Sequence, residues 1–268
     1  MVAESLSKAL GSTQDSTQIK RHTRKVFVYF GNYLIDLAHL RRKVSSHQVH
    51  QYLIKIHGID NLEKALESGR PLVFAGLHFG NWDVGLELLT SLLSNRPTIG
   101  VVSPMRYMAL RKRIDNRSSR NYREVVGGRS GLALALRILK EGGVVVTMLD
   151  GPGSAVTRLP TQFLRGTALL STLPSRLAQK SQALVIPTAL AYLRQSEFAA
   201  FVGTPVEVPE AANKETLPDR MQEIVAQLEP WVRLYPAQWY CFHQVWQQDS
   251  SLEDDITERP TGVAAGKR

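Results

Sequence analysis

Cysteine is nearly absent from this sequence. Cys241 is the single cysteine among 268 residues, so no disulfide can form within the chain and nothing in it indicates an oxidising compartment. The sequence has no Cys/His cluster with zinc spacing and no internal repeat. It also has no Gly-x-Ser-x-Gly turn, which disfavours a serine hydrolase. A chain of this length can bury an ample core without disulfides or metals.

Long apolar runs are also missing. No apolar run lies close to the N-terminus, so the sequence predicts no signal peptide. The most apolar N-terminal segment is Val26–Leu40, which contains Asn32 and Asp36 and is too short and too polar for a comfortable membrane span. Basic residues flank it on both sides, which favours an amphipathic helix lying in the membrane interface. An ordinary core-packing helix is the alternative.

Acidic residues are outnumbered. The chain carries 33 Lys and Arg against 24 Asp and Glu, a formal net charge of +9. This balance suits an anionic partner such as a membrane surface, an acidic carrier protein, a phosphorylated substrate or nucleic acid. The sequence has no helix-turn-helix, RNP or zinc-finger pattern, so we expect no nucleic-acid partner.

Strand and helix patterns alternate through the middle of the chain, which predicts an α/β single domain with a mixed central sheet flanked by helices. Residues 26–248 form this domain. Residues 1–25 are polar and are predicted to be a disordered N-terminus, and residues 249–268 a flexible tail. Residues 44–68 have a helical pattern interrupted by Gly58.

The most informative stretch is Pro71–Thr90. The apolar run Leu72–Leu77 predicts a buried strand, and the spacing of apolar residues from Trp82 onward predicts a helix. His78 therefore lies at the carboxyl end of a strand, where open α/β sheets bind ligands, and Asp83 lies in the first turn of the helix. Between them, Gly80 allows a sharp turn and Asn81 is a plausible N-cap.

His78 and Asp83 suit general-base chemistry. If the Asp83 carboxylate accepts the Nδ1 proton of His78, the imidazole is held in one tautomer and Nε2 is free to take a proton. Nε2 can then deprotonate a hydroxyl as it attacks an acyl carbonyl, with no protein nucleophile. Backbone amides near the Phe79–Gly80 turn, or an arginine, would stabilise the oxyanion. The alternative is a structural histidine at a strand end and an acid favoured by the helix dipole.

The sequence around His78 and Asp83 resembles that of a known family. His-Phe-Gly-Asn-Trp-Asp, from His78 to Asp83, resembles the bacterial lipid A late (lauroyl/myristoyl) acyltransferases and the phosphatidylinositol mannoside acyltransferases. Both belong to the lysophospholipid acyltransferase superfamily, with its His-x4-Asp/Glu motif. Residues 58–69, Leu149–Asp150–Gly–Pro and Pro236–Trp246 resemble further family segments in the same order.

The resemblance implies a glycerolipid acyltransferase-like fold and a membrane-associated O-acyltransferase. It would move a fatty acyl chain from a thioester, acyl-CoA or acyl-carrier protein, to a hydroxyl of a glycolipid or phospholipid, with lipid A as one possible acceptor. The thioester is a donor substrate, and no resident cofactor or metal is implied. The resemblance also implies the cytoplasmic face of a bacterial cytoplasmic membrane. Many lipid A acyltransferases carry a clearer N-terminal transmembrane helix, so this chain looks more like a peripheral or interfacial protein.

Residues 105–129 are strongly basic. Only Asp115 and Glu124 oppose eight cations in this run, which are Arg106, Arg111, Lys112, Arg113, Arg117, Arg120, Arg123 and Arg129. A solvated helix face is one interpretation, but arginine also favours bidentate contact with phosphate. By resemblance these phosphates belong to the donor or to the acceptor lipid. Arg117 lies nearest the place of the family's arginine, and Arg106 and Arg113 are further candidates.

Two later residues complete the predicted site. By resemblance Asp150 is the family's second acidic position, beside His78, where it would hold the acceptor hydroxyl or steady an active-site arginine. A turn aspartate before glycine is the alternative. Arg158 begins a segment, residues 158–166, that resembles the loop before a donor-binding helix predicted at residues 167–179, and it is a further substrate-binding candidate. The family's usual Asp-x-Asp is absent here, which bears on the identity of the acceptor.

Two other classes of function remain open from the sequence. One is a non-catalytic protein of the same fold that binds lipid or acyl-carrier protein. The other is a thioester or lipid hydrolase that uses the same dyad to activate water. The aromatic segment Trp239–Trp246 is expected to cap the core rather than anchor at a membrane, and His243 to be structural.

Overall fold

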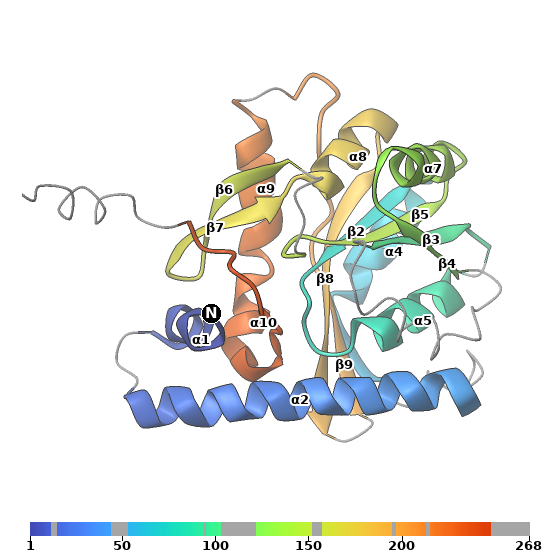
Figure 1. Ribbon diagram of the computed structural model, residues 1–268. Helices are drawn as coiled ribbons and strands as arrows, with labels where there is room; N and C mark the ends of the chain where they lie inside the picture. The colour runs from blue at the N-terminus through green and yellow to red at the C-terminus, as the bar shows by residue number, and fades with distance from the viewer. Residues whose placement is uncertain are drawn as a thin grey trace, which may run out of the picture.

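A mixed β-sheet runs through the middle of the protein (Figure 1). The computed structural model describes residues 1–11, 15–43, 53–93, 95–102, 122–151, 157–194, 197–212 and 215–247. The strand order is β1-β9-β8-β2-β5-β3-β4, with β10 paired to β8. The strands of the sheet are β1 (Leu53–His57), β2 (Leu72–Gly76), β3 (Thr98–Val102), β4 (Tyr122–Val126), β5 (Val144–Met148), β8 (Leu184–Arg194), β9 (Glu197–Val202) and β10 (Val206–Glu207).

The central strands are parallel and the late strands add antiparallel pairs. β2 lies parallel to both β5 and β8, with Phe74 opposite Val146 and Ile186. β3 is parallel to β4 and β5, whereas β8 pairs with β9 and β10 in antiparallel fashion. The predicted single α/β domain with a mixed sheet is confirmed. Because β2 and β5 are adjacent and parallel, the residues that follow them meet at one edge of the sheet.

Helices cover both faces of the sheet (Figure 1). The helices of the described chain are α1 (Val2–Leu10), α2 (Ser16–Lys43), α4 (Ile59–Glu67), α5 (Trp82–Leu92), α7 (Arg129–Lys140), α8 (Leu173–Ser181), α9 (Leu217–Ala226) and α10 (Glu229–Leu234), followed by a 3-10 turn, η2 (Pro236–Gln238). Alternate residues of β2 point to opposite faces. Val73 and Ala75 join the core beneath α7, α8 and α9, and Leu72 and Phe74 join the core beneath α4 and α5.

The N-terminal region is helical, so the prediction of disorder over residues 1–25 is wrong for the part described. α1 buries Leu6 and Ala9, and α2 begins at Ser16 and continues through the predicted 26–40 helix. In Figure 1, α2 is the long blue helix beneath α1, α10 and α5. No helix among the described residues is both long and apolar enough to cross a bilayer. The predicted tail, 249–268, lies outside the described residues.

Two further segments differ from the sequence interpretation. β6 (Arg158–Phe163) and β7 (Gly166–Ser171) form an antiparallel hairpin, so the predicted loop at 158–166 is wrong. The predicted helix at 167–179 is correct only from Leu173, where α8 begins, because its first residues belong to β7. β1 occupies part of the predicted helix over residues 44–68, although α4 follows it as a helix. In both cases pairing with a distant or neighbouring strand decides the structure of a short apolar segment that also fits a helical pattern.

Candidate active site

The turn between β2 and α5 has the predicted geometry. Gly80 adopts φ +59°, and a Cβ built there would lie 1.7 Å from the carbonyl oxygen of Leu190, so only glycine fits. Asn81 caps α5, because its side-chain oxygen accepts a hydrogen bond from the Val84 amide at 3.2 Å. The sequence thus places His78 just beyond the strand and Asp83 in the first turn of the helix.

The imidazole of His78 is held by Asp150. Nδ1 of His78 lies 2.9 Å from Oδ1 of Asp150. The carboxylate also accepts the backbone N–H of His78 at 3.0 and 3.1 Å and the indole N–H of Trp239 at 2.8 Å. A carboxylate only accepts hydrogen bonds, so Nδ1 carries a proton, and in the neutral imidazole the lone pair is then on Nε2. His78 and Asp150 follow the neighbouring parallel strands β2 and β5, which is why they meet.

Asp150 is completely buried, yet its surroundings favour the charged form. Burial alone would raise its pKa, but the charge on His78 and the hydrogen bonds from His78 and Trp239 act against this and leave the pKa below its ordinary value. The carboxylate is therefore ionised near neutral pH. A carboxyl pKa lowered by folding stabilises the fold above the unfolded-state pKa, and this stabilisation is lost as the pH falls through the folded-state pKa.

Asp83 does not take the place predicted for it. Oδ2 of Asp83 accepts a hydrogen bond from the hydroxyl of Tyr33 at 2.6 Å, and the side chain is buried. The Nδ1 atom of His78, which Asp83 is expected to bind from sequence spacing, instead contacts Asp150. The five-residue spacing gives the correct turn but not the correct partner, because the partner comes from another strand.

The backbone amides of the turn are already used. The amide of Phe79 donates to Leu77, that of Gly80 to Gln238 and that of Asn81 to Leu190. The expectation that amides near Phe79–Gly80 stabilise an oxyanion is therefore not supported, since each amide donates to a carbonyl within the protein.

The predicted arginines divide into two groups. Arg106, Arg113 and Arg117 lie outside the described residues. Arg158, which is half-buried, donates hydrogen bonds to the carbonyl of Gly151 and, at 3.3 Å, to that of Leu169. It therefore fastens the loop after Asp150 to β7. Contact between Arg158 and a substrate stays a prediction.

The C-terminal segment returns to the site, which sequence reasoning did not anticipate. The amide of Tyr240 donates to the carbonyl of His78 at 2.8 Å, and Trp239 forms a bridge with Phe79 besides binding Asp150. Trp239 and Tyr240 are buried, so the expected core-capping role is correct but incomplete. The resemblance of Pro236–Trp246 to a family segment is the one feature of the sequence that indicates a role for this segment at the site.

The thiol of Cys241 and the imidazole of His243 are also influenced by the charge of Asp150, but neither has the properties of a catalytic nucleophile or base. Burial, together with the charge of Asp150, raises the pKa of the Cys241 thiol to about 12, so the thiol stays protonated. Burial lowers the pKa of His243, although the charge of Asp150 and a hydrogen bond to its backbone oppose the shift. Nε2 of His243 is buried and has no hydrogen-bond partner within the described part of the chain.

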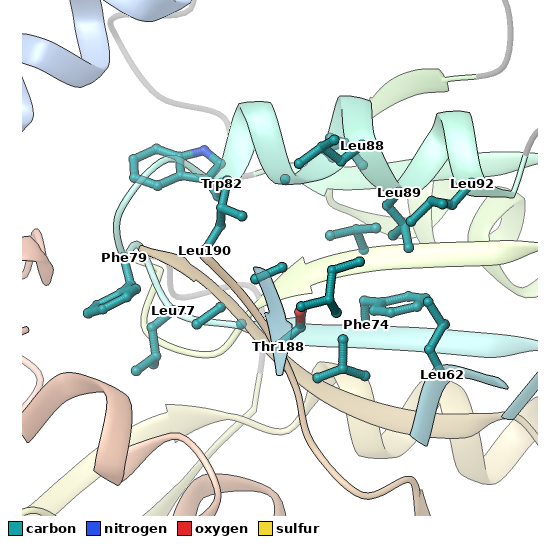
Figure 2. Close-up of a pocket in the computed structure, with 18 of the residues that line it drawn as sticks. Leu62, Phe74, Leu77, Phe79, Trp82, Leu88, Leu89, Leu92, Thr188 and Leu190 are labelled. Carbon is teal, nitrogen blue, oxygen red and sulfur yellow. The ribbon is translucent and has the colours of Figure 1, made fainter. Parts of the chain in front are cut away.

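An apolar pocket adjoins the turn on the face covered by α4 and α5 (Figure 2). The cavity itself is small, about 80 Å³, and it opens to solvent. Leu77, Phe79 and Trp82, on either side of His78 in the sequence, form part of the wall. Other lining side chains labelled in Figure 2 are Leu62, Phe74, Leu88, Leu89, Leu92, Thr188 and Leu190. The lining is almost entirely apolar, so the pocket suits an apolar group next to the motif.

The arrangement of a buried carboxylate, an imidazole bonded to it through Nδ1 and an adjoining apolar pocket is chemically suited to general-base chemistry on an apolar substrate. The chain belongs to the bacterial lipid A biosynthesis acyltransferase family, whose model matches residues 5–248. It is therefore an acyltransferase that acts on lipids.

One solved structure similar to the chain is the 1-acyl-sn-glycerophosphate (LPA) acyltransferase PlsC from Thermotoga maritima. The sequences are 14% identical, the TM-score is 0.41, and the match covers 81% of this chain and 96% of that chain. Among curated proteins, none matches the chain.

Proposed function

We propose that the protein transfers a fatty acyl chain from an acyl thioester to a hydroxyl of a glycolipid or phospholipid, with His78 as the general base. The observation that carries this proposal is the hydrogen bond from Nδ1 of His78 to the buried Asp150 carboxylate. Asp150 takes the orienting role that sequence spacing assigns to Asp83. Asp83 remains a candidate for positioning the first turn of α5.

The reaction follows from this arrangement. Nε2 of His78 accepts the proton of the acceptor hydroxyl as its oxygen bonds to the thioester carbonyl carbon. The tetrahedral intermediate then collapses, the carbon–sulfur bond breaks, and the thiolate leaves with the proton that Nε2 returns. Asp150 stabilises the transient imidazolium by its charge. The arginines of residues 105–129 are the candidates for holding the phosphates of the donor or acceptor.

The proposed donor is acyl-CoA or acyl-carrier protein. A transfer assay identifies the donor and the acceptor lipid. Purified protein is incubated with a labelled donor of each kind and the lipid extract of its host, and new labelled lipids are identified by mass. A labelled glycolipid or phospholipid supports the proposal and names both substrates. Transfer to no lipid from either donor contradicts it.

The apolar pocket is the proposed place of the acyl chain. Gly85 of α5 lines it, and a Cβ there would meet only Leu190, at 3.5 Å. Gly85→Leu should fill the pocket and disfavour long chains. Loss of room for two methylenes, at about 0.8 kcal/mol each, predicts a fall of roughly tenfold in kcat/KM for long donors relative to short ones. The measurement is kcat/KM over donors of graded length.

Gly85→Ala serves as the matched control, because its Cβ makes an ordinary contact. Its chain-length profile should stay close to that of the wild type. A Gly85→Leu profile identical to wild type would place the acyl chain elsewhere.

We further propose that α2 lies on the cytoplasmic surface of a bacterial cytoplasmic membrane without spanning it. Val28 and Ile35, on one face of α2, are 62% and 56% exposed, and Arg24 and Lys25 precede them. Exposed apolar side chains beside cations suit an anionic bilayer.

Val28→Glu/Ile35→Glu is expected to weaken binding to anionic vesicles by at least about tenfold, since two apolar side chains no longer insert and two negative charges face anionic lipid. The measurement is co-sedimentation with vesicles of anionic or zwitterionic lipid. Val126→Glu, an equally simple change on the edge strand β4, should bind like wild type. Equal binding by all three proteins would show that α2 is not the contact.

A further inference from the structure

Two polar side chains on the inner face of α2 reach the turn that carries His78. Tyr33 is 4% exposed, and its hydroxyl donates to Oδ2 of Asp83 at 2.6 Å. Asp36, three residues later, accepts a hydrogen bond from Nδ2 of Asn81 at 3.1 Å. A helix far from the motif in sequence thus binds both the N-cap of α5 and the acid in its first turn.

Asp36, Asn81 and Tyr192 are hydrogen-bonded to one another in a triangle. Oδ2 of Asp36 also accepts the hydroxyl of Tyr192 at 2.7 Å, and that hydroxyl accepts the second Nδ2 proton of Asn81 at 2.9 Å. Oδ1 of Asn81 accepts the Val84 amide. Every hydrogen-bonding atom of this fully buried amide has a partner. Burial and the bond to Asp36 raise the pKa of Tyr192, so its hydroxyl remains protonated and donates.

The ring of Tyr33 connects α2 to the imidazole through one side chain. Its centroid lies 4.2 Å from the Trp82 ring. The Trp82 ring in turn meets the His78 ring edge-on at 5.2 Å. Tyr33 therefore packs against the ring of Trp82 and donates a hydrogen bond to the side chain of Asp83.

We propose that Tyr33 and Asp36 are positioning residues for His78, acting through Trp82, Asp83 and Asn81. The inference rests on the proposed function. The backbone of the turn is fixed by Gly80 and its neighbours. The side chain of Asp83 binds Tyr33 of α2, and the ring of Trp82 packs against Tyr33 and against Tyr240. Small displacements of reacting groups reduce the rate of the chemical step more than they reduce binding.

Tyr33→Phe removes only the hydroxyl, and Asp36→Asn keeps the shape while replacing the carboxylate. Both are expected to lower kcat by about ten- to a hundredfold, with the KM for the acyl donor within about twofold of wild type. Tyr29→Phe is the matched control. Tyr29 lies one turn before Tyr33 on α2 and packs against the Tyr192 ring at 6.0 Å, and no hydrogen bond of its hydroxyl is found within the described residues. Its kcat should equal that of wild type.

A readout independent of activity separates this proposal from the proposed function. With the imidazole nitrogens of the 7 histidines labelled, NMR reports the His78 ring signals, assigned by their loss in His78→Ala. The signals should shift in Tyr33→Phe and Asp36→Asn and stay unchanged in Tyr29→Phe. If no transfer is found with any donor, this shift alone decides the proposal. Unshifted ring signals, or a fall in kcat that only follows the folded fraction in thermal melts, would overturn it.

Discussion

His78→Ala is expected to lower turnover by about three orders of magnitude, within the range that a positioned general base contributes. Without Nε2 the acceptor hydroxyl must attack as a neutral group or pass its proton to water. The fold should persist, because the His78 side chain is 23% exposed and the backbone bonds of the turn do not need the ring. The measurement is steady-state transfer with saturating donor, together with a thermal melt.

His22→Ala is the control for this variant. His22 lies on α2, and within the described residues its ring hydrogen-bonds only to a carbonyl of its own helix, that of Gln18 at 3.0 Å. We expect wild-type turnover and stability. Near wild-type turnover in a folded His78→Ala protein would remove the proposed general base.

Asp150→Asn should be nearly as damaging, with a loss of about 10²- to 10⁴-fold in kcat. The amide keeps the size of the carboxylate, but its oxygen and nitrogen cannot both reproduce the present contacts. If the amide oxygen of the variant accepts from Trp239, its N–H group faces Nδ1 of His78. This favours the tautomer in which Nδ1 has no proton and Nε2 cannot act as a base. The imidazolium also loses its counter-charge.

Asp83→Asn is the informative comparison for Asp150→Asn. Asp83 is equally a buried carboxylate near the motif, but it binds Tyr33 rather than Nδ1 of His78. Its replacement should therefore cost less than that of Asp150. The reverse order, a severe loss for Asp83→Asn with Asp150→Asn close to wild type, would restore the dyad suggested by spacing.

Stability offers a second check on Asp150. Because its pKa is lowered in the folded protein, the wild type gains stability above the unfolded-state pKa and loses it on acidification. Asp150→Asn lacks this dependence. The difference in unfolding free energy between the two proteins should shrink as the pH falls, and denaturant melts over acidic pH would show a constant difference if the carboxylate were not favoured in the fold.

The sequence predicted the local parts of the site because local chemistry determines them. Gly80 alone fits against Leu190, Asn81 caps the helix, and an apolar run before His78 forms a strand. The partner of His78 could not be read in the same way. Asp150 meets it only because β5 lies beside β2 in the sheet, and nothing in the spacing of residues 78–83 carries that information.

The same distinction explains the contribution of α2. The composition of residues 1–25 is polar on average, which predicts disorder, but α1 forms a helix that buries Leu6 and Ala9. Asp36 looked like a polar interruption of an interfacial segment. In the structure its polarity is required, since it pairs with Asn81 and Tyr192. Such pairings join residues far apart in the chain and become visible only with the fold.

The general-base role of His78 in acyl transfer is tested by following the fate of a labelled acyl group. Purified wild-type protein and His78→Ala are each incubated with labelled acyl thioester, with and without host lipid. We expect label in a new lipid, only with wild-type protein and only when lipid is present. Free labelled fatty acid formed without any acceptor would show that the site activates water instead, and labelled lipid formed equally by His78→Ala would contradict the mechanism.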